Sequence, residues 1–175
     1  MSCIEAFATE ARRFCDWLMQ GRDSGERAAH AGLVRLCRLY TAALELPDLR
    51  FTESGDSDAD DVRQDDWKRA YAAAGRLPVG LYKEVYDPAG DLSEDEDPVV
   101  GDLADDLADI FRDVMRGLRA FDSGDMNNAL WEWRFNLAHH WGAHATAAIR
   151  VLHMWLQTNA PSRLQQSAAD ASEST

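Results

Sequence analysis

Apolar residues recur every three or four positions along most of the chain, which is the period of an amphipathic α-helix. The pattern predicts one helix over residues 2–20 and a second that begins at Asp23 or Ser24 and ends before Pro47. We expect these two helices to form an antiparallel hairpin. A shorter helix is predicted over residues 62–74.

The stretch 131–156 has the most distinctive pattern, because it holds four of the six tryptophans together with several histidines. At about 100° per residue, its apolar positions form one broad face, which predicts a central helix. The residues expected to point inward are Trp131, Phe135, Ala138, Trp141, Ala145, Ile149, Leu152 and Leu156. A second stripe combines Trp133 and Val151 with the imidazoles of His140 and His144. A packed flank with hydrogen-bonded histidines would account for that stripe in structural terms.

A long helix is predicted to precede this stretch, with Asp102 as its N-cap and its end near Ala120. The sequence Ser-Gly-Asp at 123–125 predicts a tight turn into the next helix, so the two helices should form a long C-terminal antiparallel hairpin. Residues 81–86 are expected to form a helical turn. No run of alternating apolar and polar residues indicates a sheet.

These elements predict an all-α fold, a helical bundle of about five to six helices in a single domain over residues 1–160. The acidic segments 48–61 and 87–100 lack helical periodicity and are interpreted as surface connections, the first without an assigned role. Pro161 should end the last helix. The polar residues 161–175 are expected to form a disordered tail.

The net charge of −13, from 31 acidic against 18 basic residues, argues against nucleic-acid binding, which needs clustered Lys and Arg. It is compatible with a basic protein partner, and solubility alone would also account for it.

No apolar run approaches the roughly 18 residues of a membrane span. The N-terminus has no signal-peptide pattern. Cys3, Cys15 and Cys37 lack metal-finger spacing, so a reducing cytoplasm is expected.

Negative charge is concentrated between Glu84 and Arg112, where ten carboxylates occur without a single Lys or Arg. The electrostatic field of such a cluster mainly speeds association with a positively charged partner. The residues predicted to contact that partner are Asp87, Asp91, Glu94, Asp95, Glu96 and Asp97. The first functional hypothesis is therefore a protein-binding module that neutralises a basic partner, as an immunity protein does.

The second hypothesis comes from the predicted C-terminal hairpin, since residues equidistant from its turn lie opposite each other. This places Asp109 opposite His140 and Asp106 opposite His144, in a groove that also includes Trp133. Two carboxylates and two imidazoles suit a divalent ion such as zinc, manganese or iron. The groove could then serve a metal-dependent enzyme. The structural alternative, with no cofactor, is a set of Asp–His hydrogen bonds that raise the imidazole pKa values.

Two blocks, DPVVGDLADDLADIFRD at 97–113 and ALWEWRFNLAHHWGAHATAAIRVLH at 129–153, resemble a bacterial domain-of-unknown-function family, number 5063. The similarity extends through LPVGLYKEVYDP at 77–88 and, more weakly, to the N-terminal helices. The resemblance implies a helical fold and a bacterial source, and it supplies no catalytic residue. Within the matching blocks, the positions of interest are Asp106, Asp109, Trp133, His140, Trp141, Gly142 and His144.

Overall fold

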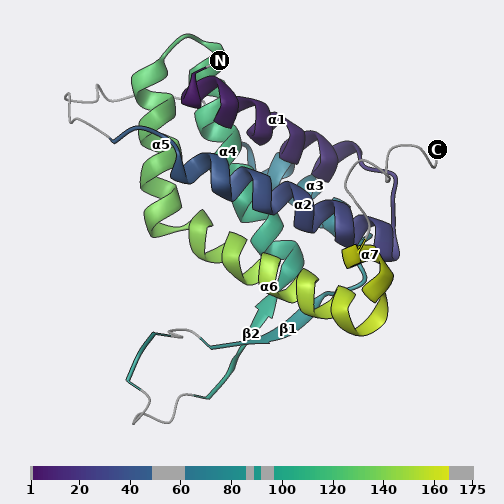
Figure 1. The fold of residues 1–175 in the computed structure, drawn as a ribbon. Coiled ribbons are helices and arrows are strands. Elements are labelled where there is room, and N and C mark those ends of the chain that lie inside the picture. The colour runs from purple at the N-terminus through teal and green to yellow at the C-terminus, as the bar shows by residue number, and fades with distance from the viewer. Residues whose placement is uncertain (1, 49–61, 86–88, 92–96, 166–175) are drawn as a thin grey trace.

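The computed structural model describes residues 2–48, 62–85, 89–91 and 97–165, which form a helical bundle with a small two-stranded sheet at one end (Figure 1). The helices are α1 (Cys3–Gln20), α2 (Gly25–Leu44), α3 (Gln64–Ala74), α4 (Leu103–Asp122), α5 (Met126–His139), α6 (Trp141–Asn159) and α7 (Pro161–Gln165). The strands are β1 (Leu81–Glu84) and β2 (Val99–Asp102). The predicted all-α fold class is confirmed.

Helix α4 is the centre of the bundle, because it packs against α1, α3, α5 and α6. Its apolar stripe is almost completely buried and includes Leu103, Leu107 and Ile110. The Asp102 side chain accepts a 2.9 Å hydrogen bond from the backbone N–H of Ala104 and so caps the helix as predicted. The stretch 131–156 was expected to occupy this central position, and that expectation is wrong.

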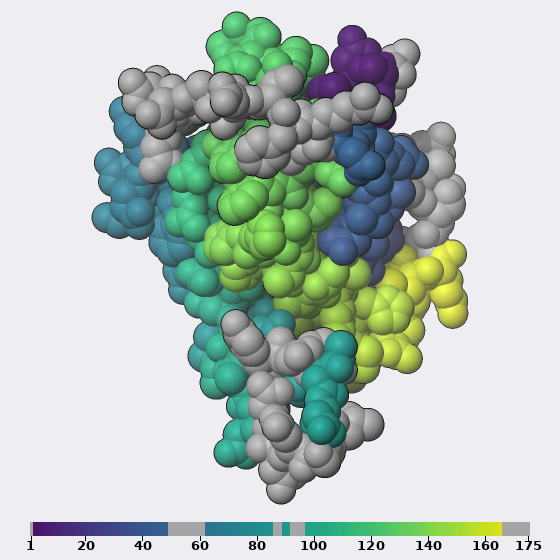
Figure 2. Space-filling view, turned by 90° about the vertical axis from the view of Figure 1, so that its left-hand side faces the viewer, coloured from purple at the N-terminus to yellow at the C-terminus, as the bar shows by residue number. Residues whose placement is uncertain are grey.

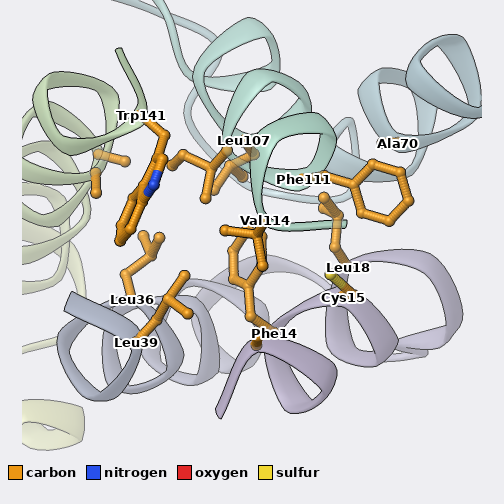
Figure 3. Close-up of a cluster of buried hydrophobic side chains, with 14 of the residues drawn as sticks. Phe14, Cys15, Leu18, Leu36, Leu39, Ala70, Leu107, Phe111, Val114 and Trp141 are labelled. Atoms are coloured by element: carbon orange, nitrogen blue, oxygen red, sulfur yellow. The ribbon is translucent and has the colours of Figure 1, made fainter. Parts of the chain in front are cut away.

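The core is formed by side chains from helices that are distant in sequence (Figure 3). Phe14 from α1 and Leu36 from α2 lie beneath Leu107 and Val114 from α4, while Trp141 from α6 closes one side. All five side chains are fully buried. Burying an apolar side chain of this size stabilises the fold by about 1.5–3 kcal/mol, so this cluster fixes how α4 and α6 lie relative to each other.

The predicted C-terminal helix is interrupted at His140, where the backbone adopts φ −149° and ψ −85°. The chain packs tightly at this break, since a Cβ on Gly142 would lie 2.1 Å from the carbonyl oxygen of Leu137. The interruption turns α5 relative to α6, so the two helices do not share one apolar face.

The break changes which aromatic residues are buried. Trp133 is completely buried, whereas Phe135 is 43% exposed and stacks on the half-buried Trp131. The prediction that Trp131 and Phe135 form the core is therefore wrong, while it is confirmed for Trp141 and Leu152 and met in part by the half-buried Ile149. Periodicity alone assumed one continuous helix, and the interruption shifts the inward face of α5 by part of a turn.

Residues 81–86 were expected to form a helical turn, and Leu81–Glu84 is instead the strand β1, which pairs antiparallel with β2. The register places Tyr82 opposite Gly101. The hairpin leads directly into α4, because Asp102 both ends β2 and caps the helix. Figures 1 and 2 show the strands projecting beyond the end of the bundle.

The turn between α4 and α5 is as predicted, with Gly124 at a positive φ of 89° and the Asp125 side chain accepting from the Asn128 N–H at 3.1 Å. The prediction of a disordered tail over 161–175 is wrong for its first five residues, since Pro161–Gln165 forms α7 and Arg163 pairs with Glu26 of α2. Proline is favourable at the first position of a helix, which explains why Pro161 begins a helix here. Residues 166–175, and residues 49–61 of the predicted 48–61 connection, lie outside the described residues.

Among the described residues, none of the helices combines the length and the apolar character that a membrane crossing needs.

Candidate functional site

Two imidazoles at the start of α6 face a row of carboxylates on α4. His144 Nδ1 lies 2.8 Å from Asp106 Oδ1, and His140 Nδ1 lies 2.6 Å from Asp113 Oδ2. The two rings meet edge to face with their centroids 4.8 Å apart. Asp106 and Asp113 are almost completely buried, while both histidines are partly exposed. Each imidazole is thus held by a buried carboxylate and has its other edge toward a shared space.

Asp109 lies in that shared space. Its Oδ2 atom is 3.7 Å from His140 Nε2 and 3.7 Å from His144 Nε2. Its Oδ1 atom accepts a 2.8 Å hydrogen bond from the Trp67 indole of α3 and lies 3.0 Å from an Arg112 guanidinium nitrogen. The carboxylate is therefore fixed on one side, with its second oxygen directed at the two imidazoles.

These three residues are the cluster in the described part of the chain with metal-ligand character. One ligand atom each from Asp109, His140 and His144 can be chosen so that all three lie within 4.8 Å of one another. In a tetrahedral site with metal–ligand bonds of about 2.0–2.2 Å, neighbouring ligand atoms lie about 3.4 Å apart. Contraction by a few tenths of an ångström would bring the 3.7 Å separations into that range.

The surrounding charges favour the protonated form of one imidazole. The hydrogen bond to Asp106, opposed by partial burial and reinforced by the charges of Asp106 and Asp109, raises the pKa of His144 above its usual 6.5. Burial, together with the charges of Asp109 and Asp102, raises the pKa of the neighbouring Asp105 carboxyl. Negative charge thus accumulates around the imidazoles, which also favours any cation that replaces a proton there.

A tyrosine from the β-hairpin completes the surroundings of Asp106. The Tyr82 hydroxyl donates a 2.7 Å hydrogen bond to Asp106 Oδ2, so both oxygens of this buried carboxylate are engaged. Burial, followed by the contact with Asp106, raises the pKa of Tyr82 far above its usual value. The hydroxyl therefore remains a donor at physiological pH.

The structure brings together four of the residues predicted for the groove, Asp106, Asp109, His140 and His144. The predicted closeness of Asp106 and His144 is confirmed. His140 approaches Asp109 as expected, but its hydrogen bond goes to Asp113, one turn further along α4. The helix break explains the shift, since an unbroken helix would have placed His140 level with Asp109.

Trp133 does not belong to the groove. It is fully buried, its ring centroid lies 4.7 Å from that of Phe7, and its indole N–H donates to the Val114 carbonyl oxygen at 3.0 Å. The prediction that Trp133 lines the groove is wrong, because the break at His140 turns its side of α5 into the core.

Sequence reasoning missed Asp113, Tyr82 and Trp67 as members of the site. Asp113 lies on the same stripe of α4 as Asp106 and Asp109, so the stripe itself was a usable signal. Tyr82 and Trp67 come from segments 24 and 42 residues away from their carboxylate partners. No local pattern indicates contacts over such separations.

The residues predicted to bind a basic partner are only partly described. Asp91 and Asp97 are exposed near the projecting hairpin. Asp87, Glu94, Asp95 and Glu96 lie outside the described residues. The acidic surface therefore stays a prediction.

Comparison with known proteins places the fold in a family. The crystal structure of protein BF1032 from Bacteroides fragilis is similar, with a TM-score of 0.70 and 23% sequence identity over 87% of this chain and 90% of that chain. That likeness concerns the fold alone. A search of curated proteins found no match. The family model described as "Domain of unknown function (DUF5063)" matches residues 2–158. The chain therefore belongs to the DUF5063 family, as the two sequence blocks predicted.

Proposed function

We propose that this protein binds one divalent transition-metal ion through Asp109, His140 and His144 and uses it as the catalytic centre of a metal-dependent enzyme. The observation that carries the proposal is the convergence of two imidazole Nε2 atoms on one carboxylate oxygen, at 3.7 Å each. This combination of two histidines and one carboxylate is a recurrent ligand set for zinc and for iron(II).

The hydrogen bonds made by the Nδ1 atoms of the two histidines support the proposal. A metal-binding histidine usually donates its second N–H to a carboxylate, which fixes the tautomer and makes the ring a stronger ligand. Asp113 and Asp106 occupy those positions for His140 and His144. With Nδ1 donating in each case, the free electron pair of the neutral ring lies on Nε2, toward Asp109.

The number of protein ligands favours a catalytic centre over a structural one. Structural zinc sites are closed by four protein ligands, whereas catalytic sites keep a position for water or substrate. The proposed site has three protein ligands, and the side chains of His140 and His144 are 36% and 26% exposed. An ion held by them would polarise a substrate oxygen or lower the pKa of bound water.

Metal-stripped protein titrated with zinc, manganese and anaerobic iron(II) tests the proposal. We expect one ion per chain, with the free energy of unfolding raised by about 2.7 kcal/mol when the free ion is at 100 times Kd. His144→Ala and Asp109→Asn should abolish the shift. His139→Ala, which removes an exposed imidazole next to His140, and Asp16→Asn, which neutralises an exposed carboxylate on α1, are matched controls that should retain it. Equal binding by all four variants would refute the site.

We also propose, as a second function, that the acidic segment 87–97 binds a basic protein in a bacterial cytoplasm. The exposure of Asp91 and Asp97 beside a projecting hairpin favours this function. The free thiols of Cys3, Cys15 and Cys37 suit a reducing compartment. Replacing Asp91 and Asp97 with Lys should weaken capture of basic lysate proteins at low salt and have little effect at high salt, because surface charges are screened there. Unchanged capture at low salt would contradict this function.

A further inference from the structure

A polar pocket of about 560 Å³ opens beside His140, between α4, α5 and the start of α3. This volume lies within the range of about 300–1,000 Å³ typical of small-molecule sites. The side chains that line the pocket include Arg63, Arg112, Arg116 and His140. Figure 2 shows the face on which α5 and α6 lie between α3 on one side and α2 on the other.

Three guanidinium groups in one pocket are unexpected in a chain with a net charge of −13 and only 18 basic residues. Arg112 and Arg116 lie one turn apart on α4 and therefore on the same face of that helix. Arg63 precedes α3 and is largely exposed, and the Asp66 carboxylate lies 3.9 Å from its guanidinium group. The pocket thus brings positively charged side chains together in a chain whose net charge is negative.

Carboxylates also lie near these guanidinium groups, within 3.0–3.9 Å of Arg63 and Arg112. Asp113 also lines the pocket, but its Oδ2 atom is bonded to His140 Nδ1 and its Oδ1 atom lies 3.9 Å from Arg112 Nε. Arg112 is shared with Asp109. An anion entering the pocket would meet guanidinium groups and the imidazole of His140 among the side chains that line it.

We propose that this pocket binds an oxyanion group of the substrate, a phosphate or a carboxylate, and so positions the rest of the molecule next to the Asp109–His140–His144 centre. Guanidinium groups recognise both oxyanions through paired N–H donors. The assignment of the bound molecule as a substrate rests on the proposed metal centre, whereas anion binding itself does not require the ion.

The test uses the full chain stripped of metal, in a low-salt buffer free of oxyanions. Inorganic phosphate and succinate are titrated separately, and binding is followed by calorimetry and by backbone amide NMR. We expect millimolar or tighter binding, with amide shifts around Arg116 and His140. Arg116→Gln and Arg63→Gln should each weaken binding by about fivefold or more, and the tighter of the two anions identifies the group that is recognised.

Arg38→Gln provides the matched control, since Arg38 is exposed on α2 and does not line the pocket. Arg63 is also exposed, so its variant should fold normally even if Arg116→Gln does not. The inference is overturned if neither anion binds, or if Arg38→Gln weakens binding as much as Arg63→Gln. A parallel metal titration separates the two ideas. Anion binding without metal binding would refute the metal centre and the assignment of the anion to a substrate, and it would leave the anion site itself standing. Metal binding without anion binding would refute only this inference.

Discussion

The Tyr82 hydroxyl lies 2.7 Å from Asp106 Oδ2, and the other oxygen of that carboxylate lies 2.8 Å from His144 Nδ1. One short chain of hydrogen bonds thus connects the β-hairpin with the imidazole that is proposed to bind metal. The carboxylate is almost completely buried, so losing either partner leaves an oxygen that water cannot easily satisfy.

Replacing Tyr82 with Phe should therefore weaken metal binding while keeping the aromatic ring. Outer hydrogen-bond partners of metal-binding histidines typically contribute about 10–100-fold to affinity, and we expect the lower end because Asp106 keeps its bond to His144. Competition with a chelator measures the change in Kd. Tyr71→Phe is the control, since the Tyr71 hydroxyl bonds Asp102 at 2.8 Å and does not contact the cluster. Equal losses in both variants would contradict a specific role for Tyr82.

The sequence predicted the site more closely than it predicted the core around it. The pairing of Asp106 with His144 follows from their similar distance to the turn at Gly124, because that turn and the caps on either side of it have strong local signals. For His140 the same argument held only in part, because the imidazole approaches Asp109 but hydrogen-bonds Asp113, one turn further along α4. A helix break that keeps apolar residues on both sides leaves the periodic pattern intact, so periodicity could not reveal it.

The β-hairpin was missed for a different reason. Its strands have only four residues each, too few for the alternation of polar and apolar side chains to stand out. Several of their side chains are also exposed, with Leu81 at 70% and Val100 at 73%. Their pairing depends on a contact between segments on either side of the acidic stretch, which no local pattern encodes.

The stability of the metal-free protein should depend on pH through His144. Its folded-state pKa is raised by the hydrogen bond to Asp106, so the protonated ring stabilises the fold. This contribution is complete below the ordinary pKa of about 6.5 and is lost as the pH rises through the higher folded-state value. We therefore expect the free energy of unfolding of wild type to fall as the pH rises through that window.

Urea unfolding of the chelator-treated protein at a series of pH values measures this change. His144→Gln removes the titrating group, so the difference in unfolding free energy between wild type and variant should shrink as the pH increases. His153→Gln is the control, because His153 is exposed on α6. If the difference in unfolding free energy between wild type and His144→Gln grew with pH, the result would show that His144 is held in its neutral form instead.

Truncation of two aromatic residues that were both predicted for the core should change the stability by different amounts. Trp141 is completely buried, and truncating it to Ala should cost about 3–5 kcal/mol of unfolding free energy. Phe135 is 43% exposed and contacts Trp131 and His139 at the surface. Phe135→Ala should cost less than about 1 kcal/mol. Denaturant unfolding of both variants checks the contrast, and similar losses would show that α5 packs against the core as one helix with α6.

The contact between Gly117 and Trp133 should determine whether α4 and α5 can pack together. Alanine usually stabilises a helix interior by about 0.5–1 kcal/mol relative to glycine. At Gly117, however, a Cβ would lie 2.2 Å from Trp133 Nε1 and 2.4 Å from its Cδ1. The indole cannot move away easily, because it is fully buried and its N–H is bonded to the Val114 carbonyl oxygen.

Gly117→Ala should therefore destabilise the protein by about 1–3 kcal/mol, as overpacking of a dense core does, despite the better helix propensity of alanine. Gly80→Ala is the matched control, since a Cβ there meets no atom within 4 Å, and its effect should stay within about 0.5 kcal/mol. Thermal and urea unfolding of the two variants provide the measurement. If Gly117→Ala were as stable as wild type, the indole would have room to shift, and the close packing of α4 against α5 would not be what holds Trp133 in the core.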